Sequence, residues 1–183
     1  GGRDEMESVQ DNVQVVAESI RLYNLAQAAE KLIESNTADT LKELLDHMGD
    51  LLDEVGAHYT VESQEKGVTK FTIETCELYM YIDKSIEGGL ALPPDHQRIF
   101  KGDKLLCGSI LIYRKDNRTN KFHLIKRLLV NEENKISSQF ENTRFEETDK
   151  LVVIAQNVIR DALTVKPKKC YPKCSEIIEL ETL

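Results

Sequence analysis

The sequence contains no tryptophan, only 4 prolines and 4 cysteines, and 6% aromatic residues among 183 residues. No apolar run reaches the roughly 18–20 residues that a transmembrane helix requires, so we expect no membrane partner. The opening Gly1-Gly2-Arg3-Asp4 does not resemble a signal peptide, and it indicates a cloning scar or a cut from a longer protein. Hydrophobic residues make up 40%, which is enough for the core of one domain with extensions.

An excess of basic charge is also absent. Lysine and arginine number 24 against 32 aspartates and glutamates, giving a net charge of −8. An acidic chain repels nucleic acid and anionic membranes. The basic run Lys166-Pro167-Lys168-Lys169 is short and lies in the tail. We therefore expect neither a nucleic acid nor a membrane surface as the partner.

The cysteines and histidines do not form a metal-binding pattern. Cys76 and Cys107 lie in apolar, strand-like segments and are expected to be buried thiols, which fits a reducing cytosol and predicts a cytoplasmic protein. The spacing of Cys170 and Cys174 would suit half of a zinc site or a redox pair, but the chain offers no second half, and the alternative is a disordered tail with two exposed thiols. The histidines are scattered, and we expect no metal site.

Motifs for catalysis are missing as well. The sequence has no G-x-S-x-G, no P-loop and no glycine-rich dinucleotide fingerprint. We expect no cofactor and no enzymatic activity. An enzyme that uses Cys107 is a weaker alternative, because no basic residue adjoins this cysteine in sequence to lower its pKa.

Two terminal helices with similar apolar spacing are the main positive signal. Residues 4–34 predict one long helix, and an interruption at Ser35–Thr37 precedes a second helix that ends near Gly56. Residues 146–165 predict a closing helix. Apolar residues in the first and last helices step alternately by three and four, as in helices that pair along a narrow stripe. The predicted dimer interface consists of Met6, Val9, Val13, Val16, Ile20, Leu151, Ala155, Val158 and Ala162. The alternative is that the two stripes pack against each other within one chain.

The middle of the chain predicts strands. Strand-like segments occur near 58–62, 68–73, 78–82, 105–113, 122–130 and 136–140. A long connection at residues 85–103 contains Gly88-Gly89 and Pro93-Pro94, and long connections of this kind are often binding loops. The predicted fold class is α+β, with an antiparallel sheet between terminal helices.

This order resembles that of a GAF domain. The local resemblance lies in the opening helices, in Gly108-Ser109-Ile110-Leu111-Ile112 as a central strand, and in Phe145–Ala155 as the closing F-x-x-x-D-x-x-L-x-x-I-A. It implies a GAF-like domain over residues 18–165, with a helical extension at 1–17, a linker or tail at 166–183, and both helices on one face of the sheet. The sequence departs from the family in the roughly 30 residues between the central strand and the closing helix, and the cyclic-nucleotide pattern N-K-x-x-x-F-x-x-x-D-E is not matched.

The resemblance also implies a function. GAF-like domains hold small ligands between the sheet and a covering loop, which here places His96, Arg98 and Lys101 as candidate ligand-binding residues. We expect a sensory or regulatory domain that couples a small ligand or partner to flanking dimeric helices and to a downstream signalling domain. The alternative is a dimerisation or docking module that binds no ligand.

Overall fold

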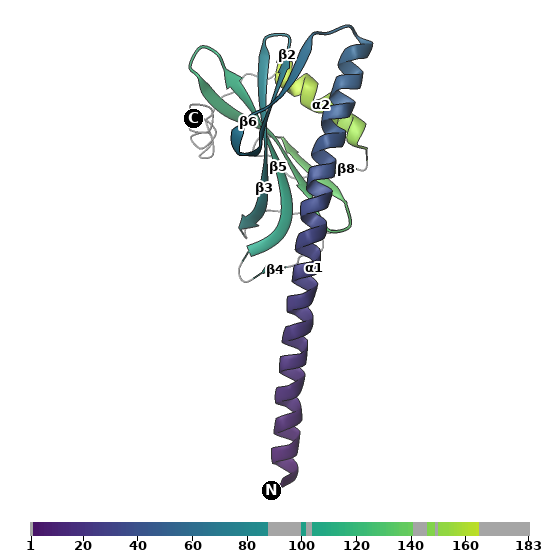
Figure 1. The fold of residues 1–183 in the computed structure, drawn as a ribbon, viewed down its shortest axis with the longest axis vertical. Coiled ribbons are helices and arrows are strands. Elements are labelled where there is room, and N and C mark those ends of the chain that lie inside the picture. The colour runs from purple at the N-terminus through teal and green to yellow at the C-terminus, as the bar shows by residue number, and fades with distance from the viewer. Residues whose placement is uncertain (1, 88–99, 102–103, 141–145, 149, 165–183) are drawn as a thin grey trace.

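The computed structural model describes residues 2–87, 100–101, 104–140, 146–148 and 150–164. The side chains of residues 2–7, 84–87, 100–107, 139–140 and 146–148 are outside this description. Two helices, α1 (Gly2–Glu54) and α2 (Leu151–Thr164), precede and follow the strands in sequence, which confirms the α+β class (Figure 1).

Helix α1 is continuous, so the predicted interruption at Ser35–Thr37 is wrong. The Thr37 hydroxyl donates a hydrogen bond to the Ile33 carbonyl oxygen at 2.6 Å, within the helix. The Asn36 side-chain amide donates to the carbonyl oxygens of Asn131 and Glu132, each at 3.2 Å. These polar side chains therefore bond within the helix and to the sheet, and no helix end is formed.

The sheet is an antiparallel meander in the order β1-β2-β3-β5-β6-β7-β8, and β4 also pairs with β5. A short 3-10 turn, η1 (Glu65–Gly67), joins β1 to β2. The strands are β1 (Tyr59–Ser63), β2 (Val68–Ile73), β3 (Cys76–Glu87), β4 (Phe100–Lys101), β5 (Lys104–Asp116), β6 (Lys121–Val130), β7 (Ile136–Phe140) and β8 (Glu146–Thr148). The predicted strand segments all fall in or overlap these strands.

Two boundaries differ from the prediction. Strand β3 continues to Glu87, and β4 begins at Phe100, so the long connection is shorter than 85–103. Residues 88–99 lie outside the described part of the chain. Glu146–Thr148 pair with β7 as an edge strand, and the closing helix begins at Leu151. Residues 146–148, which the sequence predicts as the start of the closing helix, are therefore part of the sheet.

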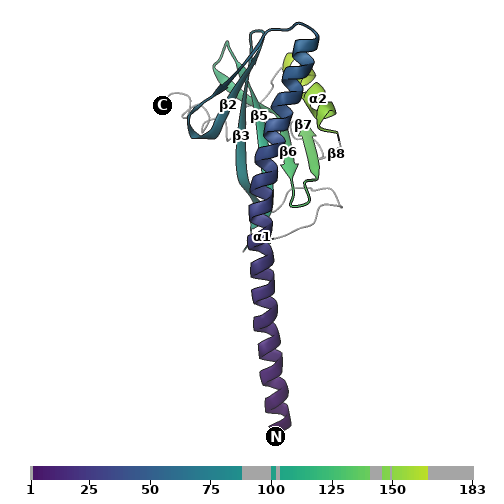
Figure 2. The ribbon, with the colours of Figure 1, turned by 45° about the vertical axis from the view of Figure 1, so that its right-hand side comes forward.

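The main core lies between the helices and one face of the sheet (Figure 2). Leu44 and Met48 of α1 are fully buried there, together with residues of β2, β3, β5 and β6. The predicted interface residues Ala155, Val158 and Ala162 of α2 are also fully buried in this core, and Leu151 is half-buried against it. Because these side chains pack within one chain, the α2 half of the proposed interface is not available to a second copy.

The second face of the sheet carries a separate aromatic cluster. Side chains alternate between the two faces along a strand, so neighbours of core residues point away from the helices. The Tyr79 and Phe122 rings meet edge to face, with centroids 4.9 Å apart. The second-face cluster consists of Val68, Tyr79, Leu111, Tyr113, Phe122 and Leu124 and contains no residue of either helix.

A buried ion pair joins α2 to the sheet. The Lys126 Nζ of β6 lies 3.7 Å from the Asp161 Oδ2 of α2, with side chains only 7% and 8% exposed. Asp161 also pairs with Arg160, whose Nη2 lies 3.1 Å from its Oδ1, so a cation from the sheet and a cation from the same helix share this carboxylate. The pair therefore fixes the position of α2 along β6.

Helix α1 and strand β5 approach each other closely at Gly108. A Cβ atom added to this glycine would lie 1.7 Å from Thr37 Oγ1 and 2.9 Å from Thr37 Cβ. Thr37 is only 1% exposed at this contact. A glycine inside a strand often marks such a close approach of another backbone. The contact sets the distance between helix and sheet.

Replacement of Gly108 by alanine should therefore destabilise the fold. The added methyl group would push α1 away from β5, which we expect to lower the free energy of unfolding by about 1–3 kcal/mol in urea titrations. The double variant Gly108→Ala with Thr37→Ala removes the nearest atoms and should recover part of the loss. Equal stability of Gly108→Ala and the wild-type chain would contradict the contact.

Candidate functional site

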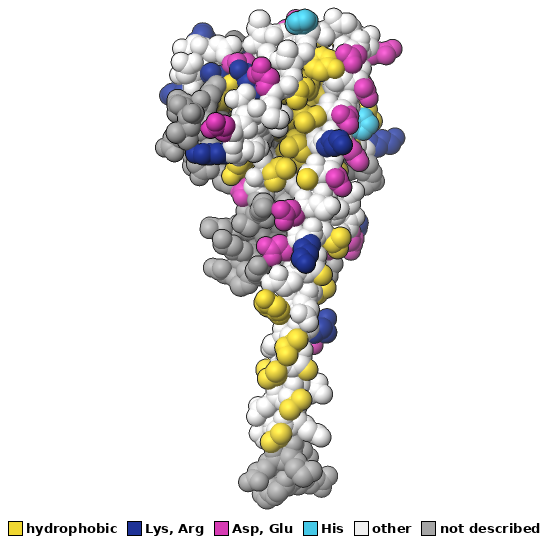
Figure 3. All heavy atoms as spheres, viewed as in Figure 1, with side chains coloured by type: hydrophobic (Ala, Val, Ile, Leu, Met, Phe, Trp, Pro, Cys, Tyr) yellow, Lys and Arg dark blue, Asp and Glu magenta, His cyan; other side chains and the backbone are white. Residues whose placement is uncertain are grey.

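The N-terminal part of α1 extends beyond the rest of the molecule (Figure 1). Every side chain from residue 8 to residue 25 is exposed, and Ala26 is the first that is buried. Figure 3 shows hydrophobic side chains along this projecting part. The exposed stripe of α1 consists of Val9, Val13, Val16, Ile20 and Tyr23, between 56% and 63% exposed. The Met6 side chain lies outside the description.

Charge is missing from both flanks of the exposed stripe, although the chain as a whole carries a net charge of −8. In a heptad that places the stripe at positions a and d, the flanking e and g positions often carry charges that select the partner. Here these flanking positions are Gln10, Asn12, Ala17, Ser19, Asn24 and Ala26. A second copy of the same helix would meet no charge repulsion along these flanks.

The spacing of the exposed stripe continues along the whole of α1. After Tyr23 the same alternation of three and four residues passes through polar positions and then through core positions. The continuation is Gln27, Glu30, Glu34, Thr37, Leu41, Leu44, Met48 and Leu51. Leu41, Leu44 and Met48 are buried against the sheet, while Glu30, Glu34 and Thr37 line a pocket. A 3.5-residue spacing drifts by about 20° per heptad on a straight helix, so the projecting part, the pocket wall and the core are consecutive segments of one helix that lie on different sides of it.

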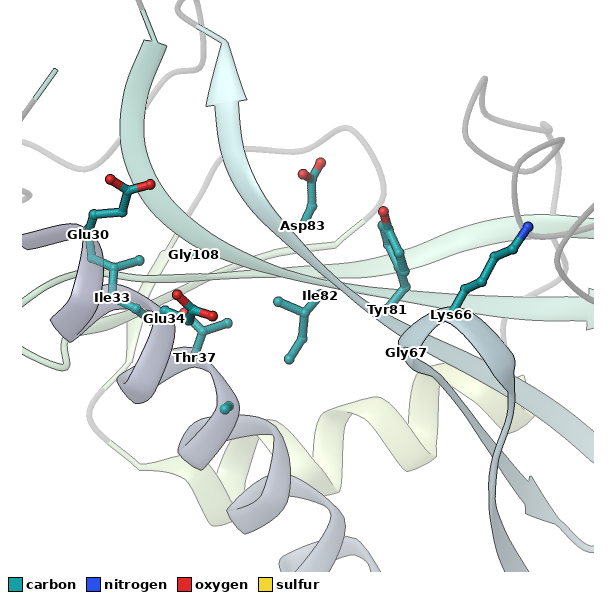
Figure 4. Close-up of a pocket in the computed structure, with 11 residues that line it drawn as sticks. Glu30, Ile33, Glu34, Thr37, Lys66, Gly67, Tyr81, Ile82, Asp83 and Gly108 are labelled. Atoms are coloured by element: carbon teal, nitrogen blue, oxygen red, sulfur yellow. The ribbon is translucent and has the colours of Figure 1, made fainter. Parts of the chain in front are cut away.

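The pocket lies between the middle of α1 and the sheet and has a volume of about 590 Å³ (Figure 4). This is within the usual range for small-molecule sites, about 300–1,000 Å³. Its walls come from α1, from the turn before β2, from β3 and from β5. The lining residues are Glu30, Ile33, Glu34, Thr37, Ala38, Lys66, Gly67, Tyr81, Ile82, Asp83 and Gly108.

The inner surface of the pocket is mainly apolar. Figure 4 shows Ile33 and Thr37 on α1, and Ile82 of β3 pointing toward the helices. Tyr81 and Asp83 point to the opposite side of β3, as the alternation of the strand requires. The Thr37 hydroxyl is held by the Ile33 carbonyl oxygen. A ligand in this pocket would contact α1 on one side and β3 on the other.

The side chains of the predicted ligand-binding residues are outside the description, so their role stays a prediction. His96 and Arg98 fall in residues 88–99, and Lys101 belongs to β4 with its side chain outside the described set. The pocket residues were not found from the sequence. The available signal was Gly108, a glycine inside an apolar strand, which indicates close backbone approach at that position.

The described residues do not form a metal-binding cluster. They contain no group of three or more His, Cys, Asp or Glu side chains able to hold a metal ion. The Cys107 side chain is outside the description. Cys76 is half-buried, and its Sγ donates to the Ala162 carbonyl oxygen at 3.5 Å. Burial raises the pKa of this thiol, more than the nearby Arg114 lowers it.

No helix in the described part of the chain is long and apolar enough to cross a membrane. Comparisons with protein-family models, with curated proteins and with solved structures found no match.

The raised pKa of Cys76 predicts slow alkylation in the folded protein. Only the thiolate reacts, so labelling by iodoacetamide should be slow at pH 8 and should rise as the pH approaches the raised pKa. The urea-unfolded chain, in which the thiol is solvated, provides the control and should react faster at the same pH. Peptide mass mapping assigns the label to Cys76. Equal rates in folded and unfolded protein would contradict the burial.

Proposed function

We propose that this protein is a GAF-like sensory or regulatory domain that couples the pocket between α1 and the sheet to pairing of α1 with a second copy. The observation that carries the proposal is the continuity of α1, which runs without a break from the projecting part past the pocket wall into the core. A displacement of α1 at the pocket would move the exposed stripe with it.

A partner for the projecting helix is supported by helix energetics. Isolated short helices are marginal in water, and β-branched residues are weaker helix formers than alanine or leucine. The projecting part nevertheless contains Val9, Val13, Val15, Val16 and Ile20, all more than half exposed. Burying one such side chain contributes about 1.5–3 kcal/mol. Pairing through the uncharged stripe would supply the stability that the single helix lacks.

Coupling requires a ligand that prefers one helix arrangement. A ligand shifts an equilibrium only by its difference in affinity for the two states. The walls of the pocket would allow such a preference, since Ile33 and Thr37 lie on α1 while Ile82 lies on β3. A small, mainly apolar ligand that touches both sides would favour one separation of helix and sheet. The free thiol of Cys76 suits the reducing cytosol where we place this domain.

A docking or dimerisation module without a ligand is the second candidate. The exposed stripe favours it, because pairing of α1 requires no occupant in the pocket. In this case the output would be assembly alone. The two candidates share the dimer and differ in the pocket, so separate experiments distinguish them.

A charged substitution in the exposed stripe tests the dimer. Val16→Glu should convert the dimer to a monomer, because a carboxylate would be buried at the centre of the pair. Loss of the valine contact alone, about 1.5 kcal/mol or more, would weaken association about tenfold. Val15→Glu is the matched control, since Val15 is adjacent, 65% exposed and off the stripe. Light scattering after size exclusion measures the mass.

The expected order is a dimer for the wild-type chain and Val15→Glu and a monomer for Val16→Glu. A monomeric wild-type chain, or equal loss in both variants, would remove the stripe as the interface.

The ligand is tested by filling the pocket. Ala38 lines the pocket from α1, so Ala38→Trp should occupy part of its volume and exclude the ligand. Asp39→Trp adds the same side chain one position away, at an exposed residue that does not line the pocket. Native mass spectrometry of freshly purified protein should show a retained small molecule in the wild-type chain and Asp39→Trp, and none in Ala38→Trp. A wild-type chain without added mass would favour the docking module.

A further inference from the structure

The second-face cluster is buried although neither helix lies on it. Tyr79, Tyr113 and Phe122 are each 1% exposed, while α1 and α2 pack on the opposite face. Lys70 and Lys115 of neighbouring strands lie over the Tyr79 and Phe122 rings, and these two side chains are too few to bury all six residues of the cluster. The low exposure of the whole cluster therefore indicates further cover over this face.

We propose that residues 165–183, which follow α2, dock on the second-face cluster within the same chain. The last turn of α2 lies close to the start of β3, since the Cys76 Sγ donates to the Ala162 carbonyl oxygen at 3.5 Å. Tyr79 is three residues further along β3, about 10 Å away. A segment of this length can extend up to about 60 Å, which is sufficient to reach all three rings.

The other undescribed segments fit the position less well. Residues 88–99 connect Glu87 to Phe100, and Glu87 lies about 26 Å along β3 from Tyr79. A segment that must leave and return extends only about 20 Å from its ends. Residues 141–145 connect β7 to β8, which lie beyond β6 in the sheet order. The distances that the segments can span therefore favour the segment that follows α2 over the other two.

The composition of residues 165–183 also suits the side chains on the second face of the sheet. Lys70 Nζ and Lys115 Nζ lie 5.8 and 5.9 Å from the ring centroids of Tyr79 and Phe122. Arg127 lies opposite Leu111 on the same face, and its Nε is buried without a hydrogen-bond partner. Both lysines pair with Glu77, and the segment 165–183 supplies apolar side chains and further acceptors within eight residues. These are Ile177, Ile178, Leu180 and Leu183 together with Glu176, Glu179 and Glu181.

Hydroxyl-radical footprinting of the full chain tests the docking. Ile178→Asp with Leu180→Asp should release the segment and increase oxidation of Tyr79, Tyr113 and Phe122 several-fold. Ser175→Asp with Thr182→Asp adds the same charge at polar positions of the segment and should leave the rings protected. Met48 and Met80, both fully buried in the main core, report whether each variant remains folded.

Three results would overturn the proposal. Rapid oxidation of the rings in the wild-type chain would mean that the face is uncovered. Protection that survives Ile178→Asp with Leu180→Asp and does not change with dilution assigns the cover to another part of the chain. Protection that is lost on dilution of the wild-type chain assigns it to a second copy.

A second measurement applies if the double variant does not fold. Carbodiimide cross-linking of the dilute wild-type chain should join Glu176, Glu179 or Glu181 to Lys70 or Lys115 within single chains. Peptide mass spectrometry of the monomeric fraction identifies these links. Their absence, while the Glu77 link to Lys70 forms across its 2.9 Å ion pair, would also overturn the proposal.

Discussion

The close contact between Thr37 and Gly108 determines how α1 lies on the sheet. With no side chain on Gly108, the helix backbone approaches β5 closely enough to bury Thr37. On the C-terminal side of this contact, Leu41, Leu44 and Met48 enter the main core. On the N-terminal side the helix leaves the sheet, and the pocket opens beside it. The core, the pocket and the projecting stripe are thus successive parts of one helix held at one point.

The sheet has two apolar faces of different origin. The helix-covered face contains leucine, isoleucine and methionine side chains from five strands and both helices. The second face is richer in aromatic rings and is built from strands alone. A sheet that buries both faces needs cover on both, which links the strand sequence to segments far away in the chain.

The sequence predicted the strands well because the change from helical spacing to short apolar runs is local information. Segments near 68–73, 105–113 and 122–130 correspond closely to β2, β5 and β6. The predicted helix break failed because Asn36 and Thr37 resemble capping residues, whereas the sheet and the preceding helical turn supply their hydrogen-bond partners. Glu146 and Glu147 resembled a helix start because pairing with β7 is a long-range contact that local patterns do not contain.

The site was harder to predict than the fold for a related reason. The pocket combines residues 30–38, 66–67, 81–83 and 108, which are distant in sequence and individually ordinary. The apolar spacing of α2 shows a related limit of prediction from sequence. Its spacing is real, but Ala155 and Val158 satisfy it inside their own chain. Spacing indicates that a helix face is buried and does not identify what buries it.

The Lys126–Asp161 pair has a mechanical consequence for the two helices. Sliding α2 along β6 would pull apart opposite charges in a medium of low polarity, so resistance to such movement is steep. Helix α1 is attached mainly by apolar contacts, whose energy changes gradually with small displacements. A displacement of α1 at the pocket would therefore move its projecting part, while the ion pair keeps α2 in place.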